Sequence, residues 1–91
     1  MQKVRVHLYV SGKVQGVFFR QNVKRCAQSC GVYGWVRNLS DGRVEAVFEG
    51  VDLSVKEVIA YCHHGPSFAK VEFVEVFFED YLGEFFDFRI V

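Results

Sequence analysis

The sequence lacks an excess of charge of either sign, because eleven Lys and Arg residues balance eleven Asp and Glu residues. A general nucleic-acid binder needs a basic excess to displace counterions from phosphates, so this balance argues against DNA or RNA as a partner. No apolar run approaches the roughly 20 residues of a membrane span. The first residues also lack the apolar core of a signal peptide. We therefore expect no nucleic-acid partner, no membrane partner and a cytoplasmic location.

Cysteine is scarce, and the three thiols, at positions 26, 30 and 62, cannot all pair. We expect small, reduced residues in or near the core rather than a disulfide or a metal site. The adjacent His63 and His64 cannot both face one metal from a helix. The carboxylates form no obvious acid–base pair. We therefore expect no metal and no cofactor.

Hydrophobic residues are abundant, at 51% of the chain, and ten of the 91 residues are Phe. A chain of this length is sufficient for one domain, residues 1–91, and a small domain needs a dense core of this kind.

Apolar residues alternate with polar ones in several stretches, which predicts strands at residues 4–10, 32–38, 43–49, 69–79 and 86–90. Helical spacing predicts helices at residues 19–30 and 55–62. We expect Ser11-Gly12-Lys13 to end the first strand and Asp52 or Ser54 to cap the second helix. The Asp41-Gly42 pair predicts an antiparallel hairpin. The alternation slips between Val71 and Val74, which indicates a bulge or a twist.

This order of elements, β-α-β-β-α-β plus a short C-terminal strand, predicts an α+β fold of the ferredoxin-like type. We expect a mostly antiparallel sheet with two helices on one face. Proteins with this fold have many different functions, so the fold alone does not predict the function of this chain.

The stretch from Val14 to Arg20 joins the first strand to the first helix and is the main candidate site. Gly12 and Gly16 relax the backbone, so its N–H groups can curl toward an anion, and the N–H groups of a helix's first turn carry partial positive charge. The Arg20 guanidinium can add a bidentate contact. The stretch therefore predicts a phosphate-binding loop, although an ordinary surface arginine is the alternative.

Asn38 ends the second predicted strand and can lie close to this loop. Its amide has both an acceptor and donors, so it can hold a water and donate to an oxyanion. From position alone, a turn-starting Asn that bonds its own backbone is the commoner role.

The residues that carry these features resemble the acylphosphatase family over essentially the whole chain. The similarity includes Ser11-Gly12-Lys13-Val14-Gln15-Gly16-Val17-Phe18-Phe19-Arg20 and Gly34-Trp35-Val36-Arg37-Asn38. It continues through Asp41-Gly42, Val44-Glu45-Ala46, Gly65-Pro66 and Phe88-Arg89-Ile90. Ser67 and Val32 depart from the usual pattern, and neither belongs to the expected site.

The resemblance implies metal-independent hydrolysis of the carboxyl-phosphate bond of acyl phosphates to a carboxylate and inorganic phosphate. Carried over by motif position, Arg20 and Asn38 are the catalytic residues. Asn38 orients the attacking water, and the phosphate-binding set is Gln15, Gly16, Val17, Phe18, Phe19 and Arg20.

Two alternatives stay open. One is a non-catalytic ferredoxin-like module that binds an anion or another ligand. The other is the acylphosphatase-like domain found at the start of larger hydrogenase maturation proteins. Because the sequence ends at Val91 with no further domain, we expect a free-standing enzyme. We also expect a monomer.

Overall fold

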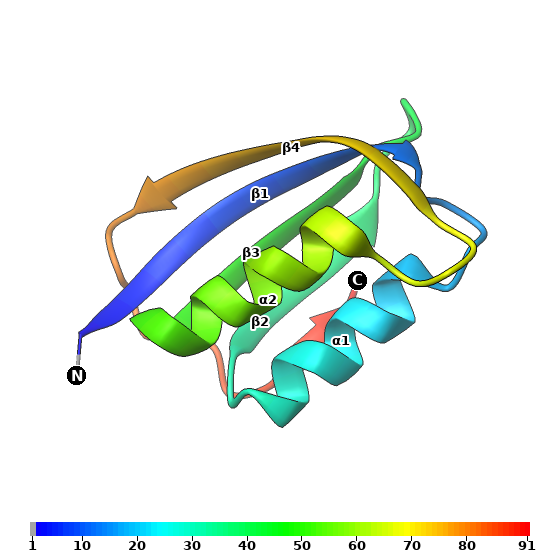
Figure 1. Cartoon of the computed structure of the whole chain (residues 1–91). Helices are drawn as coiled ribbons and strands as arrows, with labels where there is room; N and C mark the ends of the chain where they lie inside the picture. Colours follow the sequence, from blue (N-terminus) through cyan, green and yellow to red (C-terminus); the bar gives the residue numbers. More distant parts are fainter. Residues whose placement is uncertain (1) are drawn as a thin grey trace.

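The computed structural model describes residues 2–91 and contains five strands and two helices within that range (Figure 1). In chain order these are β1 (Lys3–Lys13), α1 (Phe19–Ser29), β2 (Tyr33–Asn38), β3 (Val44–Val51), α2 (Asp52–His64), β4 (Lys70–Glu79) and β5 (Phe88–Ile90).

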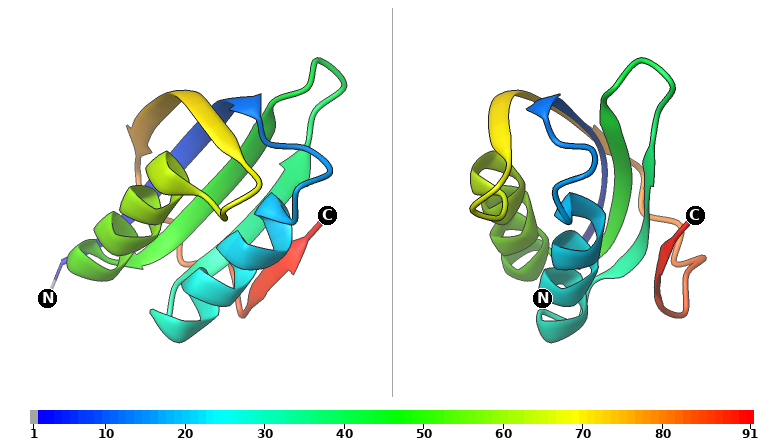
Figure 2. Two further views of the ribbon diagram at one scale, coloured as in Figure 1. Left: turned by 45° about the vertical axis from the view of Figure 1, so that its right-hand side comes forward. Right: turned by 90° about the vertical axis from the view of Figure 1, so that its right-hand side faces the viewer.

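The strands form one sheet in the order β4-β1-β3-β2-β5. β5 runs parallel to β2, and every other neighbouring pair is antiparallel. Both helices cover the same face of this sheet (Figure 2). The predicted ferredoxin-like α+β architecture, with its hairpin and its short last strand, is therefore confirmed.

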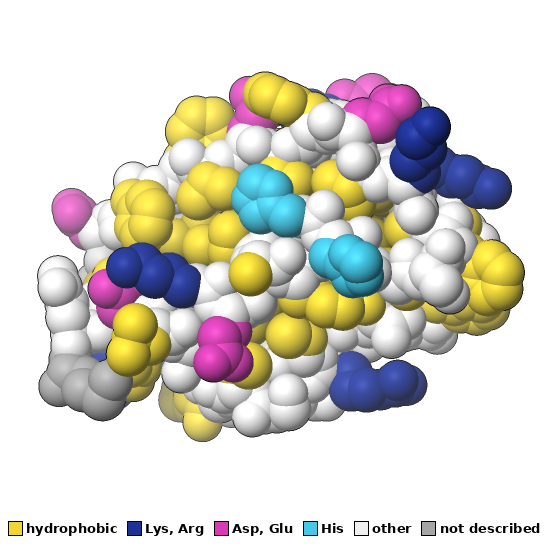
Figure 3. All heavy atoms as spheres, in the orientation of Figure 1, with side chains coloured by type: hydrophobic (Ala, Val, Ile, Leu, Met, Phe, Trp, Pro, Cys, Tyr) yellow, Lys and Arg dark blue, Asp and Glu magenta, His cyan; other side chains and the backbone are white. Residues whose placement is uncertain are grey.

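The core lies between the sheet and the helices. Alternate residues of β1 and β3 face it and are at most 1% exposed: Val6, Leu8, Val10, Val44, Ala46 and Phe48. The helices contribute Phe19, Val23, Ala27, Val55, Val58 and Cys62. Each large buried side chain contributes about 1.5–3 kcal/mol. Figure 3 shows the helix-covered side, where acidic and basic side chains are scattered among apolar ones.

β1 continues through Ser11, Gly12 and Lys13, so the prediction that these residues end the strand is wrong. They pair with the start of β4 across a bulge, because Ser11 lies opposite Phe73 while Gly12 lies opposite Val71. Glu72 is thus the extra residue, and the bulge predicted between Val71 and Val74 is confirmed.

The start of α2 also differs from the prediction. Val51 is the N-cap, Asp52 and Ser54 lie inside the helix, and no side chain caps it. The chain passes directly from β3 into α2, and the Asp52 N–H donates to the Gln2 carbonyl at 2.9 Å. At the other end of the chain β5 begins only at Phe88, and Phe86, expected in the strand, is 91% exposed.

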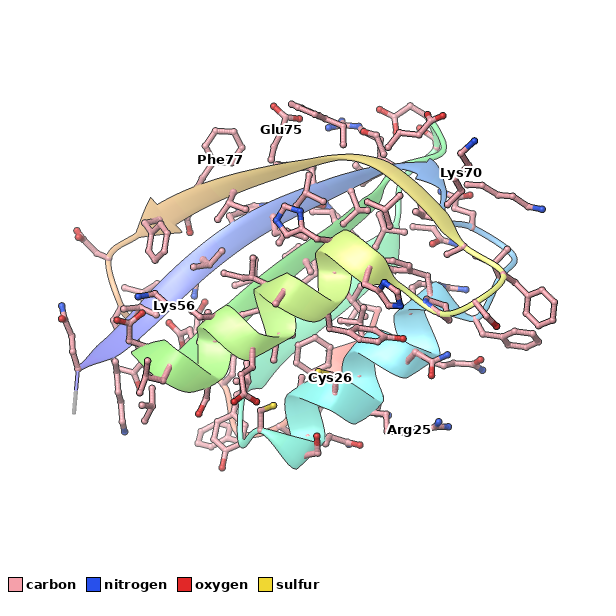
Figure 4. All side chains as sticks on the ribbon, viewed as in Figure 1. Arg25, Cys26, Lys56, Lys70, Glu75 and Phe77 are labelled. Atoms are coloured by element: carbon pink, nitrogen blue, oxygen red, sulfur yellow. The ribbon has the colours of Figure 1, made fainter. Side chains whose placement is uncertain are left out.

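The connection from β4 to β5 crosses the outer face of the sheet, because these strands form opposite edges (Figure 2). Glu49 of β3, only 2% exposed, lies beneath it. Elsewhere on this side, Glu75 and Phe77 extend from β4 away from the helices (Figure 4). Neither α1 nor α2 is long and apolar enough to cross a membrane.

Candidate active site

The loop between β1 and α1 is held by buried residues at both ends. Val14, Val17 and Phe19 are at most 5% exposed. Between them Gly16 has φ 73°, and Phe18 has φ 65° and ψ 22°. This left-handed conformation costs an L-residue about 1–2 kcal/mol. It is stabilised by Asn22, whose side-chain amide donates to the Phe18 carbonyl at 2.8 Å and whose N–H donates to it at 3.2 Å.

The backbone N–H groups of residues 15–20 are free to bind a ligand. No hydrogen bond among residues 2–91 uses any of them as a donor. Phe18 is the N-cap of α1 and has no side-chain acceptor, and the first turn contains no acidic residue. The positive end of the helix is therefore neither capped nor neutralised, as an anion site requires.

Arg20 lies in the first turn of α1 and lines a hollow of ≈ 250 Å³ together with Val14, Gly16, Phe18, Phe19 and Gln21. It forms no ion pair with any of the described residues. The guanidinium charge thus remains available to a ligand in the hollow. Of the predicted phosphate-binding residues, Gly16, Phe18, Phe19 and Arg20 line this hollow, whereas Gln15 and Val17 do not.

Asn38 is the last residue of β2 and lies opposite Val44. Val36, two residues earlier on the same strand, belongs to the core, so Asn38 lies on the helix side of the sheet. Its Oδ1 atom is buried and has no hydrogen-bond partner. An unsatisfied buried acceptor costs about 1–3 kcal/mol, and no donor among the described residues offsets this cost here.

Gln15 connects the phosphate loop to the segment that follows Asn38. Its side-chain amide donates to the carbonyls of Leu39 and Arg43, at 2.7 and 2.9 Å. Asn38 itself does not line the hollow beside Arg20. The structure therefore ties the loop to the turn after Asn38, but it does not place Asn38 in the hollow that Arg20 lines.

Comparison with known proteins identifies the family. The sequence model of the acylphosphatase family matches residues 6–90. The chain belongs to the acylphosphatase family.

Two of the similar proteins match this chain over nearly their full length, and a third matches it over a small part of a longer chain. An acylphosphatase of Pyrobaculum islandicum is 60% identical, with 100% of this chain and 97% of that protein covered. The crystal structure of acylphosphatase from Bacillus subtilis has a TM-score of 0.93 at 34% identity, with 97% of this chain and 98% of that one covered. Full-length HypF has a TM-score of 0.89 at 30% identity, with 99% of this chain but only 12% of that one covered.

The turn beside the site in this acylphosphatase is held by its own polar groups. The Leu39 N–H donates to the Arg43 carbonyl at 2.8 Å, and the Arg43 N–H donates to the Asp41 carboxylate at 3.1 Å. The hydrogen bonds from the Arg43 N–H and guanidinium hold the pKa of Asp41 below its ordinary value. Asp41 therefore serves the turn, as the sequence predicts.

Cys26 lies in α1, Cys30 is the C-cap of α1 and Cys62 lies in α2, and all three thiols are free. Burial and the neighbouring Cys30 raise the pKa of Cys26 to about 11, and burial raises that of Cys62 further. Both are protonated at neutral pH and make poor nucleophiles. Among residues 2–91, no group of three or more His, Cys, Asp and Glu side chains is placed to hold a metal ion.

Sequence reasoning missed two supporting residues. Gln15 was expected to contribute only its backbone N–H, and nothing local indicates that its side chain reaches residues 39 and 43. Asn22 carries a weak signal, because it lies four residues after Phe18 and can reach that carbonyl within one helical turn.

Proposed function

We propose that this acylphosphatase binds the phosphoryl group of an acyl phosphate with Arg20 and the N–H groups of residues 15–19, while Asn38 orients the attacking water. The water oxygen forms the new bond to phosphorus, and the bond to the carboxylate oxygen breaks. The carboxylate leaves with the bonding electron pair, and a phosphate oxygen takes a proton from the water. The products are a carboxylate and inorganic phosphate.

The unneutralised loop supports the binding step. Its N–H groups have no partner among the described residues, and Arg20 beside them has no counter-ion there. Each hydrogen bond from these donors to a charged oxygen contributes about 1.5–3 kcal/mol. A loose phosphoryl-transfer transition state needs positioning and charge stabilisation more than a strong base, and this loop can supply both.

The unpartnered Oδ1 atom of Asn38 is the observation that carries the assignment of the water. No protein donor satisfies this oxygen, so a rotation of the buried amide that exposes it lets a water donate one hydrogen to it, while the lone pair of the same water stays free to attack. The carboxylate leaving group is stable as an anion, so the step can proceed without a general acid.

A paired substitution experiment tests both roles, with acetyl phosphate as substrate and EDTA present. We expect Arg20→Ala to lower kcat/KM by about 10³-fold or more and to abolish competitive inhibition by phosphate. We expect Asn38→Ala to lower kcat by about 10²–10³-fold while phosphate inhibition stays within a few-fold. Arg25→Ala is the control, because Arg25 points away from the sheet on the same helix (Figure 4).

Persistent phosphate inhibition in Arg20→Ala would contradict the phosphate site, and near-normal kcat in Asn38→Ala would assign the water to another residue. Phosphate binding by the unaltered protein without any turnover would instead indicate a non-catalytic anion-binding module.

We also infer that the enzyme works as a monomer in the cytoplasm. Free thiols, two of them only partly buried, are typical of reducing compartments. The exposed edge strand β4 contains a bulge and three glutamates, which discourage edge-to-edge pairing. Sedimentation equilibrium tests this inference: a monomer has the molar mass of one chain, 10.5 kDa, and a dimer has twice that mass.

A further inference from the structure

Phe18 is a large apolar residue in an unusual position. It is the one residue with positive φ among the described non-glycine residues, its side chain is 63% exposed, and it lines the hollow beside Arg20. An exposed ring on strained backbone is costly, and such strain is typical of functional sites.

The backbone that carries the ring is nevertheless held in place. Its neighbours Val17 and Phe19 are both buried, so the chain is anchored on either side of it. Asn22 fixes its carbonyl with two hydrogen bonds. Because the backbone is already fixed, packing of a ligand against the ring has a lower cost in conformational entropy than binding to a loop that must first become ordered.

The position of the ring matches the part of the substrate that the loop leaves uncovered. If the N–H groups and Arg20 hold the phosphoryl oxygens, as the proposed function has it, the acyl group must project from the hollow. Phe18 lines that hollow, and its exposed side chain is the large apolar surface that the loop itself offers there.

We propose that Phe18 forms the acyl subsite and makes the enzyme prefer acyl phosphates with apolar, above all aromatic, acyl groups. This proposal rests on the proposed function. The preference comes from packing of the acyl group on the ring, while the Phe18 N–H serves the phosphate.

The test compares benzoyl phosphate with acetyl phosphate, whose carboxylate leaving groups have similar acidity. The measured quantity is kcat/KM for benzoyl phosphate divided by kcat/KM for acetyl phosphate. A change in the loop that slows both reactions equally leaves this ratio unchanged. Phe18→Asn removes the ring but keeps a residue that tolerates positive φ. We expect the ratio to fall by about 5- to 10-fold in this variant.

Two further variants separate the ring from general effects. Phe18→Tyr keeps an aromatic ring and should retain the ratio. Phe78→Ala removes an exposed phenylalanine of β4, 62% exposed, and should leave both the ratio and the activity unchanged. An unchanged ratio in Phe18→Asn, or an equal fall in Phe78→Ala, would overturn the subsite. Failure of the unaltered enzyme to hydrolyse either substrate would overturn the proposed function itself.

Discussion

At the scale of single residues, one side chain joins the candidate phosphate-binding loop to the segment after β2. Gln15 donates to two carbonyls in the segment after β2, and through them it holds the phosphate loop against the end of the strand that carries Asn38. Its backbone and its side chain thus serve two different purposes.

We expect Gln15→Ala to lower the unfolding free energy by about 1–3 kcal/mol, because two hydrogen bonds are lost and the Leu39 carbonyl is left without this donor. We also expect kcat to fall by about 10-fold, because a shift between loop and strand misplaces the water relative to the phosphorus. Urea denaturation and steady-state kinetics measure the two effects. Gln28→Ala, on the exposed surface of α1, is the control. Loss of stability with unchanged kcat would show that the two hydrogen bonds of the Gln15 side chain contribute to folding but not to catalysis.

Sequence reasoning placed Arg20 at the start of a helix and Asn38 at the end of a strand, and both placements are confirmed because helix and strand patterns are local in the sequence. It could not find the reach of Gln15, whose partners lie 24 and 28 residues away. Nor could it show that the Asn38 oxygen is buried without a partner, because burial depends on how strand and loop pack.

At the scale of elements, the bulge between β1 and β4 shapes the strand that leads into the loop. Gly12 has φ 123°, and a Cβ there would lie 2.2 Å from the Lys70 carbonyl oxygen. The close approach of the two backbones therefore requires glycine.

We expect Gly12→Ala to lower the unfolding free energy by more than about 2 kcal/mol, because both backbone strain and a clash with main-chain atoms oppose the methyl group. The matched control is Gly31→Ala, where φ is also positive, at 69°, but no atom lies within 4 Å of the added Cβ. That variant should lose only about 1–2 kcal/mol. Thermal unfolding monitored by circular dichroism compares the two, and equal losses would mean that the close approach adds nothing.

Strand alternation and turn residues predicted the order of the elements, because both act between neighbours in the sequence. The extension of β1 past Gly12 was missed because glycine usually weakens a strand, and here pairing with β4 overrides that tendency. The start of α2 was missed because the strand runs straight into the helix, so the helix needs no capping turn.

At the scale of the whole molecule, the fold must carry the chain from one edge of the sheet to the other before β5 can form. The crossing segment is held by Glu49, whose carboxylate accepts N–H groups from Leu82, Gly83 and Glu84 at 2.9–3.2 Å. Arg5 bonds the same carboxylate at 3.2 Å and also pairs with Glu79 and Glu84. In the sequence Glu49 resembles an ordinary solvent-facing strand residue, because its partners lie more than 30 residues away.

This carboxylate makes stability depend on pH. Burial alone would raise the pKa of Glu49, but the hydrogen bonds from Leu82, Arg5, Gly83 and Glu84 outweigh it and lower the pKa. A lowered pKa in the folded state contributes stability above the unfolded value of about 4.3, and this contribution is lost as pH falls through the folded pKa.

We expect Glu49→Gln to lower the unfolding free energy by about 1–3 kcal/mol at pH 7. Between pH 5 and 3, the range about the carboxylate pKa, we expect this variant to lose less stability than the unaltered protein. Urea denaturation across this range measures both, with the exposed Glu72→Gln as control. Parallel acid limbs in Glu49→Gln and the unaltered protein would show that other carboxylates with a lowered pKa, such as Glu45 and Glu79, govern acid unfolding.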